Sequence, residues 1–424
     1  MVSLLSMADS KDIKVFKAAD RCDVAVVGGG IAGCVAAIHL AREGFKVVIF
    51  EKERAAHHKV CGEFLSGEGL PYLKEIGIEP KKLGAAEITT FRLHGHRLSV
   101  SHRLPMRALG LSRQRLDEKL LERAEAEGVD VRRGVFVKEL VDGLESPGGS
   151  ISLETSEGEV RAERLIVATG KSDFKSVNER EGRDSRYVGF KMHLRLKPSV
   201  MKKVKKHVDL FVFDRGYGGL SPIEDDLANF SFVIEKKALA EIGSDWDALA
   251  AHIGNSCWEA SHFLDGAEPQ FKNLVSIGSI PYGFVRRAPP PTGVFFVGDQ
   301  MAVIPSLTGD GMTIAMMTGK RAAEAIVEHV GGKARLRFAA HASTRYQREV
   351  RTLLRPQIEA GFYLHRLFRK PLFIDVIIRA TRRLPALIDA AIFATRIRVD
   401  APRRARLPFR KISLSAARTS TEPA

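Results

Sequence analysis

The sequence predicts an α/β fold in which a parallel-sheet domain is interrupted by an inserted β-sheet domain and followed by a helical C-terminal extension. Three observations support this prediction. Apolar strands end on glycines and lead into helices at two distant places, residues 23–40 and 294–330. Residues 186–236 alternate with the period of strands, and residues 334–398 have the apolar spacing of helices.

The first strand–glycine–helix segment is typical of a dinucleotide-binding unit. The β-branched run 23–27 ends on three glycines, of which Gly28 permits a tight turn and Gly30 lets the backbone approach a pyrophosphate. Gly33 allows close packing of helix on strand. Glu51 follows Gly33 by 18 residues, at the end of the next apolar strand, where a carboxylate accepts hydrogen bonds from ribose hydroxyls. We therefore predict that this unit binds a dinucleotide.

Length and composition indicate a folded chain with more than one structural unit. The chain has 424 residues, of which 45% are hydrophobic and 28% charged, as in globular proteins. Its four cysteines form neither a disulfide framework nor a CxxC metal site, which fits a reducing cytoplasm. We accordingly expect a cytoplasmic protein without a metal ion.

The net charge of +15 is confined to the C-terminal part of the chain. Residues 331–424 contain 21 Lys and Arg against 6 Asp and Glu, whereas the first 330 residues contain 45 of each sign. Such asymmetry indicates an anionic membrane surface or a nucleic acid as neighbour, with a solvated basic helical face as the alternative. No known nucleic-acid module is present, so nucleic acid ranks last.

The segment after Glu51 predicts a polar loop, a helix and several strands. Helices are expected over 67–76 and from the capping residue Ser112 to about 127, separated by strands within 87–102. Further strands are expected over 129–135, 137–141, 150–155 and 161–167, with a turn at Pro147-Gly148-Gly149. The last strand ends at Ala168-Thr169-Gly170 and should lie beside the dinucleotide.

A substrate domain is expected where long strands follow one another at 187–196, 208–213 and 229–235. The glycine-rich stretch 216–222 is interpreted as a connection between these strands. Strands return at 274–281 and 294–297, and the latter leads to Gly309-Asp310-Gly311-Met312 and a helix to about Val330. A second glycine loop at a helix N-terminus is a second anion-binding device, so both loops can hold one extended cofactor.

The C-terminal extension has helical periodicity that prolines interrupt. Pro356, Pro371 and Pro385 are expected to kink the helix or divide it. No apolar run reaches the roughly twenty residues that span a bilayer, but a basic amphipathic helix can lie on a membrane surface. The expected organisation is a flexible leader (1–20), a first part of the cofactor domain (21–185), an inserted sheet domain (186–285), a return to the cofactor domain (286–331), a basic amphipathic tail (332–400) and a disordered end (401–424).

Taken together, the motifs resemble FAD-dependent oxidoreductases of the group A flavin monooxygenase (aromatic hydroxylase) and geranylgeranyl reductase-like superfamily. The resemblance extends from about Asp23 to Val330 and is carried by the first glycine loop with Glu51, the Leu-Ser-Arg ending at Arg113, Ala-Thr-Gly at Gly170, and Gly298-Asp299 with its following loop. It implies a Rossmann-type, glutathione reductase-like domain, FAD as cofactor, and NAD(P)H as transient electron donor.

The resemblance also implies roles for individual residues. Glu51 would contact the adenosine ribose, Arg113 the diphosphate or ribitol, and Asp299 the ribityl chain. Backbone N–H groups at Gly311 and Met312 would face the flavin pyrimidine ring and stabilise negative charge on the reduced flavin. The complete set of expected FAD-binding residues is Gly28, Gly30, Ile31, Ala32, Gly33, Glu51, Lys52, Cys61, Gly62, Arg113, Val137, Gly170, Asp299, Gly309, Gly311 and Met312.

Three segments depart from the aromatic hydroxylase pattern. Gly298-Asp299 continues as Gln-Met-Ala where Ala-Ala-His is usual, and the strand before Lys171 ends Ala-Thr-Gly where Asp-Gly is usual. The run Lys59-Val60-Cys61-Gly62-Glu63 instead looks like the reductase-like and halogenase-like branches, in which this loop passes near the isoalloxazine. Neither Trp246 nor Trp258 lies in a halogenase-type motif.

The resemblance leaves three functions open. The first is hydroxylation or epoxidation of a lipophilic polyketide, phenolic or isoprenoid substrate through a C4a-hydroperoxyflavin, at a membrane to which the basic tail docks. The second is reduction of prenyl double bonds, and the third is a flavoprotein whose tail mainly binds an anionic membrane or nucleic acid. Candidate catalytic or substrate-lining residues are Cys61, His193 and Tyr217, together with the Pro305 loop, with structural roles as the alternative.

Overall fold

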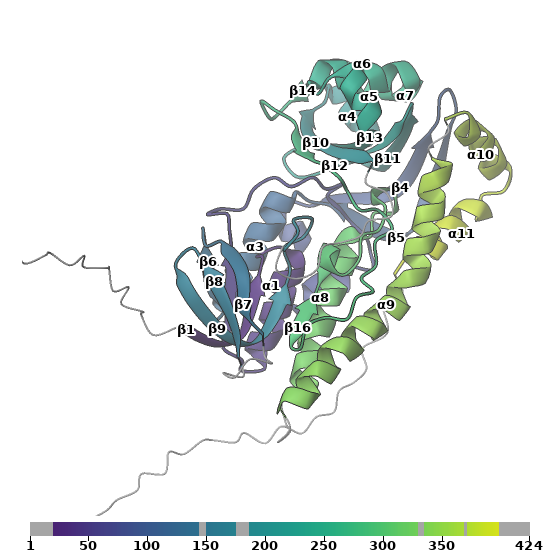
Figure 1. Cartoon of the computed structure of the whole chain (residues 1–424). Helices are drawn as coiled ribbons and strands as arrows, with labels where there is room; N and C mark the ends of the chain where they lie inside the picture. The colour runs from purple at the N-terminus through teal and green to yellow at the C-terminus, as the bar shows by residue number, and fades with distance from the viewer. Residues whose placement is uncertain (1–19, 144–149, 175–185, 330–334, 369–370, 398–424) are drawn as a thin grey trace, which may run out of the picture.

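A computed structural model describes residues 20–143, 150–174, 186–329, 335–368 and 371–397 of the chain. The predicted leader up to residue 19, the turn at 147–149 and the predicted disordered end at 401–424 lie outside the described residues. Figure 1 shows the chain as one α/β domain carrying a second sheet with its own helices, and a long C-terminal helix along one side.

The cofactor domain is built on a mainly parallel sheet of seven strands, as the sequence predicts. Its order is β6-β2-β1-β9-β8-β7, and β16 pairs with β9. Strands β6, β2, β1, β9 and β16 run parallel to one another, so their carboxyl ends meet at one edge. The strands are β1 Asp20–Val27, β2 Val47–Glu51, β6 Asp130–Arg133, β7 Val137–Asp142, β8 Ile151–Thr155, β9 Gly158–Val167 and β16 Val294–Phe296.

The long strand β9 brings the two glycine loops to the same edge of the sheet. Its first half pairs with β8 in an antiparallel meander, whereas Leu165–Val167 pairs with β1 on one side and β16 on the other. The strand predicted to lie beside the dinucleotide therefore ends next to the first glycine loop, and β16 delivers the second glycine loop next to it.

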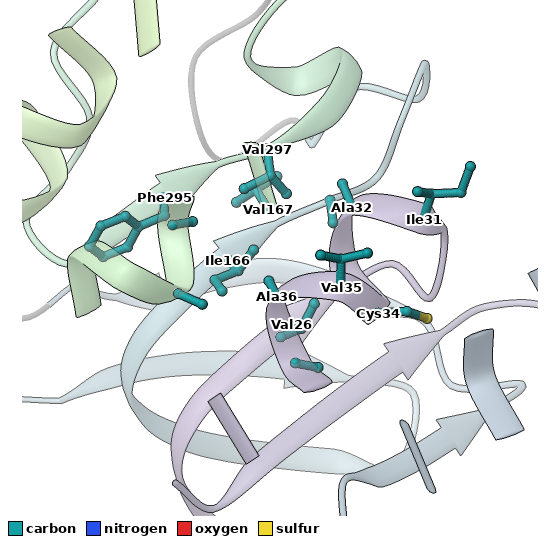
Figure 2. Close-up of a cluster of buried hydrophobic side chains, with 14 of the residues drawn as sticks. Val26, Ile31, Ala32, Cys34, Val35, Ala36, Ile166, Val167, Phe295 and Val297 are labelled. Atoms are coloured by element: carbon teal, nitrogen blue, oxygen red, sulfur yellow. The ribbon is translucent and has the colours of Figure 1, made fainter. Parts of the chain in front are cut away.

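Three helices cover this sheet: α1 Ile31–Arg42, α3 Arg113–Ala126 and α8 Gly311–Glu328. Figure 2 shows Val35 and Ala36 of α1 packed over Val26, Ile166 and neighbouring strand residues. Close packing requires glycine at two crossings. A Cβ on Gly33 would lie 2.1 Å from the Gly28 carbonyl oxygen, and one on Gly319 of α8 would lie 2.3 Å from the Ala32 carbonyl oxygen.

The second sheet has nine strands in the order β14-β10-β13-β12-β11-β4-β5-β3, with β15 paired to β10. It extends beyond the predicted insertion, because β3, β4 and β5 come from residues 64–110. Its strands are β3 Phe64–Leu65, β4 Ala86–His94, β5 Ser99–Gly110, β10 Tyr187–Arg195, β11 Lys206–Phe213, β12 Gly216–Pro222, β13 Ala228–Glu235, β14 Glu268–Pro269 and β15 Val275–Ile277.

The glycine-rich stretch 216–222 is strand β12, and its interpretation as a connection is wrong. It pairs with β11 and β13 along its length. Its glycines make room for aromatic neighbours, because a Cβ on Gly216 would lie 2.3 Å from the Phe213 ring and one on Gly218 would lie 2.8 Å from Phe232 Cβ. The strand expected over 274–281 is also shorter, since β15 covers only Val275–Ile277.

Helices cover one face of the second sheet, and the other face turns toward the cofactor domain (Figure 1). The alternation along β10 follows this division. Phe190, Met192 and Leu194 pack under the helices, whereas Lys191 and His193 point to the opposite face, as the strand period requires. The covering helices are α4 Pro198–Val204, α5 Lys236–Ile242, α6 Trp246–Ser256 and α7 Trp258–Leu264.

The C-terminal extension consists of α9 Arg335–Leu367, α10 Pro371–Arg383 and α11 Ala386–Thr395. Pro371 and Pro385 divide it as predicted, whereas α9 continues through Pro356. Helix α9 packs on the cofactor domain, where the Tyr346 hydroxyl donates to the Phe296 carbonyl at 2.9 Å. Among the described residues, no helix has the length and apolar character needed to cross a membrane. Short segments complete the chain: α2 Leu70–Glu75, and the 3₁₀ turns Pro80–Leu83, Gly298–Gln300 and Ser306–Thr308.

Candidate functional site

The carboxyl ends of the parallel strands open into one large cavity between the two sheets. Gly28 after β1, Glu51 of β2, Ala168 after β9 and Gly298 after β16 all line it. The cavity has a volume of about 1230 Å³. A ligand site at this edge is the expected position in an open parallel sheet.

The structure brings together nearly all of the residues predicted to bind the cofactor. Every one of them except Gly33 lines the cavity, and Gly33 lies behind the wall, against the Gly28 carbonyl. The lining residues from the predicted set are Gly28, Gly30, Ile31, Ala32, Glu51, Lys52, Cys61, Gly62, Arg113, Val137, Gly170, Asp299, Gly309, Gly311 and Met312.

Two glycines at helix N-termini lie beside space that no other part of the described chain fills. Gly30 caps α1 with an ordinary φ of −81°, and the nearest atom to an added Cβ would be Arg113 Nη2 at 3.8 Å. A Cβ on Gly311, the first residue of α8, would meet nothing within 4 Å. Since neither the backbone conformation nor packing requires these glycines, the free space fits a ligand group that approaches the helix N-termini.

The Glu51 carboxylate is fixed in the wall by backbone donors. Its Oε2 accepts from the Gly29 N–H at 2.9 Å, and its Oε1 accepts from the Glu53 N–H at 3.0 Å. Each carboxylate oxygen retains a further lone pair for a ligand hydroxyl. The arrangement therefore fits the role that the resemblance implies for Glu51.

The Arg113 side chain lines the cavity and is held in place there by a buried carboxylate. Its Nε and Nη2 donate to Asp117 at 2.8 and 2.9 Å, and Lys59 Nζ donates to the same carboxylate at 2.9 Å. Burial by itself would raise the pKa of Asp117, but the charges of Arg113 and Lys59 outweigh it and the pKa is lowered. The cavity wall thus carries two cations against one anion.

The Lys59–Glu63 loop is attached to the second sheet through its backbone. Asn229 Nδ2 donates to the Cys61 carbonyl at 3.0 Å, and the Ser221 hydroxyl donates to the Gly62 carbonyl at 3.4 Å. Both donors lie on the face of the sheet that turns toward the cofactor domain. Cys61 itself lines the cavity and is only partly buried.

Glu63 is the centre of a buried charged network. Its backbone has a left-handed φ of 54°, and its side chain is fully buried. Oε1 accepts from the Arg113 backbone N–H at 2.7 Å and pairs with the Lys191 ammonium, while Oε2 bonds His193 Nε2 at 2.7 Å. Burial would raise the pKa of Glu63, but the His193 hydrogen bond and the Lys191 charge outweigh it, so the pKa lies below its ordinary value.

His193 does not line the cavity, so its prediction as a substrate-lining residue is wrong. The Glu63 hydrogen bond holds it behind the wall. His58 lies on the wall instead, with its ring 4.9 Å from that of His193. Burial, together with Lys191 and His193, lowers the pKa of His58 to about 4, so its imidazole is neutral at pH 7.

The ligand atoms of His58, Glu63 and His193 lie within 4.8 Å of one another, a spacing that a metal ion could bridge. The Lys191 ammonium, however, already pairs with the Glu63 carboxylate and is fully buried. A second cation at the same carboxylate would lie beside this charge. We therefore interpret the cluster as an ion-pair network.

Tyr217 lines the cavity as predicted, at the junction with the Pro305 loop. Its hydroxyl lies 3.3 Å from the Ser306 hydroxyl, which in turn lies 2.8 Å from that of Tyr282. Burial raises the pKa of Tyr217 well above its ordinary value, so the phenol is protonated at pH 7. The loop contributes Ser306, Leu307 and Thr308 to the wall.

Apolar side chains line most of the rest of the cavity, with Asp209, Thr381, Thr395 and Arg396 as polar residues among them. Strands β4 and β11 supply one side of it, and α9, α10 and α11 supply the other. Its apolar lining comprises Phe91, Leu93, Leu104, Val208, Leu210, Val303, Leu307, Leu364, Leu367, Phe368, Ile377, Ala380, Leu387, Ile388, Ala391 and Ile392.

Residue patterns alone did not predict three parts of this site. The burial of Lys191 in a strand could have been suspected from the Phe-Lys-Met-His-Leu alternation, which places two polar side chains on one face. The role of α10 and α11 as cavity walls has no local signal. The same holds for Arg396, which lines the cavity and pairs with Asp310 at 2.7 Å.

The family to which this site belongs follows from comparison with known sequences. Residues 21–256 match the family described as FAD binding domain. The chain belongs to this family. The match covers more than half of the chain and includes the first glycine loop, Glu51 and the Lys59–Glu63 loop, so FAD is the cofactor that the cavity's dinucleotide end fits.

Curated relatives are similar over about three quarters of the chain. Flavin-dependent halogenase armH1 of Armillaria mellea is 25% identical over 73% of this chain and 65% of its own length. Digeranylgeranylglycerophospholipid reductase 2 of Methanopyrus kandleri is 29% identical over 73% of this chain and 77% of its own length. The chain therefore spans somewhat less than two thirds of the halogenase's length.

Solved structures show the same fold. The flavin-dependent brominase Bmp2 superposes with a TM-score of 0.71 at 19% identity, covering 88% of this chain and 93% of that one. PqsL of P. aeruginosa, solved with 2-aminobenzoylacetate, superposes with a TM-score of 0.70 at 18% identity, covering 84% and 100%. The FAD-binding fold predicted from the sequence is thus confirmed.

Cys61 is expected to be the one rapidly alkylated thiol of the apoprotein, because Cys22, Cys34 and Cys257 are buried. Burial raises the pKa of Cys22 to about 12 and of Cys257 to about 11, so thiolate is scarce there. Iodoacetamide labelling followed by mass spectrometry checks this. FAD should slow the reaction of Cys61, and equal rates with and without FAD would contradict its position on the cofactor wall.

Proposed function

We propose that this protein is an FAD-dependent monooxygenase that hydroxylates or epoxidises a lipophilic polyketide, phenolic or isoprenoid substrate, with NAD(P)H as electron donor. The shape of the cavity is the observation that supports this most. The two glycine loops line one part of it, and mostly apolar side chains line the rest. Its volume of about 1230 Å³ exceeds the roughly 300–1,000 Å³ of a site for one small ligand, so cofactor and substrate fit together.

Bound FAD supplies the redox chemistry and the reaction with oxygen. The protein binds and orients the cofactor and the substrate, and it excludes water from the site. The first N–H groups of α8, at Gly311 and Met312, have no partner within the helix and point out of its positive end. They would favour negative charge on a flavin ring bound against them. The apolar walls keep water away from the reacting atoms.

Two neutral polar groups could orient a phenolic or hydroxyl-bearing substrate between the walls. His58 is neutral at pH 7 and has a buried Nδ1 with no hydrogen-bond partner among the described residues. The Tyr217 phenol is protonated. A neutral imidazole accepts a hydrogen bond from a hydroxyl, and a phenol donates one. We propose these two side chains, rather than His193, as the substrate-orienting pair.

Reduction of a prenyl double bond is the alternative, and the Lys59–Glu63 loop favours it. Cys61 of this loop lines the cavity, and the Methanopyrus relative with a similar sequence is named a reductase. Reduction would consume NAD(P)H without oxygen. A third function, in which the basic tail is the main binding element, is less favoured because the tail helices form cavity walls.

A stopped-flow experiment distinguishes oxygenation from reduction. The FAD-loaded protein is reduced by light under anaerobic conditions and mixed with oxygenated buffer, with and without pentadecylphenol as a lipophilic probe. An oxygenase is expected to reoxidise in two spectral phases, with the transient species prolonged or consumed by the probe. A single phase that the probe does not alter would contradict the proposal and favour the reductase.

A further inference from the structure

Exposed apolar side chains are concentrated on the three C-terminal helices. Of the eleven large hydrophobic side chains exposed in the described residues, seven lie within residues 363–393. Globular proteins usually expose such side chains singly, and a concentration indicates an interaction surface. The seven are Tyr363, Leu367, Phe373, Val376, Leu384, Leu387 and Phe393.

The same helices form the mouth of the cavity. Leu367 and Leu387 line the cavity and are nevertheless 48% and 47% exposed, so they lie at its rim. Their helical neighbours Leu364 and Ile388 lie further inside. Helices α10 and α11 lie beside the C-terminal end of α9 (Figure 1). The apolar part of the cavity therefore opens onto the apolar outer surface.

The helices that form this mouth carry an excess of positive charge. Residues 363–396 contain seven Arg and Lys against two Asp. Arg366, Arg379 and Arg383 are exposed, and none has an acidic partner among the described residues. Surface arginines without acids attract anionic groups, and the attraction adds to apolar burial when both occur on one face.

We propose that residues 363–396 dock the protein on an anionic membrane, with the cavity mouth against the acyl chains. A two-fold contact with a second copy is disfavoured, because it would bring two surfaces with the same excess of arginines together. Docking goes beyond the proposed oxygenation, since it states where a lipophilic substrate is obtained. An apolar molecule could then pass from the bilayer to the FAD end of the cavity without crossing water.

Point substitutions test this proposal better than deletion of the tail. Helix α9 is anchored in the cofactor domain by Tyr346, and Arg396 after α11 pairs with Asp310 at the start of α8. Deletion would therefore remove a cavity wall together with the surface. By contrast, the Val376, Leu384, Arg379 and Arg383 side chains are exposed and do not line the cavity.

The experiment is co-sedimentation of the FAD-loaded full chain with vesicles of phosphatidylcholine, with or without phosphatidylglycerol. We expect binding to the anionic vesicles that weakens as salt is raised. The variant Val376→Ser/Leu384→Ser should bind at least ~10-fold more weakly. In Arg379→Gln/Arg383→Gln, the affinity for anionic vesicles should fall about fivefold per arginine, and much of its salt dependence should be lost. The controls Val141→Ser and Lys202→Gln, at exposed positions elsewhere, should bind like the wild type.

Two results would overturn the proposal. One is absence of binding to anionic vesicles, or binding that both double variants leave unchanged. The other is a dimer, seen by light scattering, that the Val376→Ser/Leu384→Ser variant abolishes while vesicle binding is absent, since the surface would then serve a second copy. The FAD absorbance and circular dichroism of each variant show whether it is folded. The assay requires no turnover, so failure of the proposed oxygenation would leave it unaffected.

Discussion

Replacing Glu63 with glutamine is expected to lower the free energy of unfolding by about 3–5 kcal/mol, the usual effect of breaking a buried ion pair. The substitution keeps the side-chain volume but leaves the fully buried Lys191 ammonium without its counter-ion. It also weakens the bonds that hold His193 and the Arg113 backbone. Urea unfolding of the apoprotein, followed by circular dichroism, measures the effect.

A double variant separates a charge effect from a packing effect. In Glu63→Gln/Lys191→Met both charges are removed, so much of the lost stability should return. If Glu63→Gln alone were as stable as the wild type, Lys191 would not depend on this carboxylate and the network would be wrongly interpreted. If the double variant were no more stable than Glu63→Gln, the shape of the side chains rather than their charge would determine stability at this site.

The pH dependence of the same variant gives an independent check. The pKa of Glu63 lies below its ordinary value of 4.5 in the folded protein. Its stabilising contribution is therefore complete above about pH 4.5 and declines as the pH falls through the folded-state pKa. The difference in stability between wild type and Glu63→Gln should shrink on acidification below pH 4.5. A difference that grows toward acid would contradict the sign of the shift.

The variant Gly30→Asp is expected to have opposite effects on folding and on cofactor binding. Aspartate is a preferred N-cap residue, and the backbone of Gly30 is already in a suitable extended conformation, so α1 should be kept or slightly stabilised. With FAD, the new carboxylate would occupy the space at the helix N-terminus and repel the pyrophosphate. Loss of one or two charge-assisted hydrogen bonds, at about 1.5–3 kcal/mol each, lowers FAD affinity roughly 100-fold.

FAD titration of the apoprotein by flavin fluorescence measures the affinity, and thermal unfolding of the apoprotein measures the stability. Gly143→Asp is the control, because a Cβ there meets nothing within 4 Å and the residue does not line the cavity. It should bind FAD like the wild type. If Gly30→Asp retained wild-type affinity, the pyrophosphate would not lie at this helix N-terminus.

Local patterns predicted the glycine loops and Glu51 of the cofactor half of the site, and the family resemblance implied its other residues. The glycines after β1, the acid ending β2 and the glycine loop before α8 are each recognisable within a few residues of a strand end. Parallel pairing then brings them together, because carboxyl ends of parallel strands share an edge. Fifteen of the sixteen predicted cofactor residues accordingly line one cavity.

The substrate half depends on tertiary contacts that no local pattern encodes. The glycines of β12 led to the prediction of a connection between strands. In the structure they make room for Phe213 and Phe232 from neighbouring strands. His193 has the spacing of a strand residue that could face a ligand, but the buried carboxylate of Glu63, 130 residues earlier, determines where it points. The sequence of the tail predicts a separate amphipathic surface element, whereas its helices also line the cavity.

The central claim is that one cavity presents a lipophilic substrate to FAD for oxygenation, and isotope labelling of products tests it most directly. The FAD-loaded protein is incubated with NADPH or NADH, oxygen-18 gas, and either pentadecylphenol or geranylgeraniol, and the organic extract is analysed by mass spectrometry. We predict a product that contains one labelled oxygen atom and whose formation requires oxygen. A product that has instead gained two hydrogen atoms, and that forms equally well without oxygen, would contradict the claim and identify the protein as a reductase.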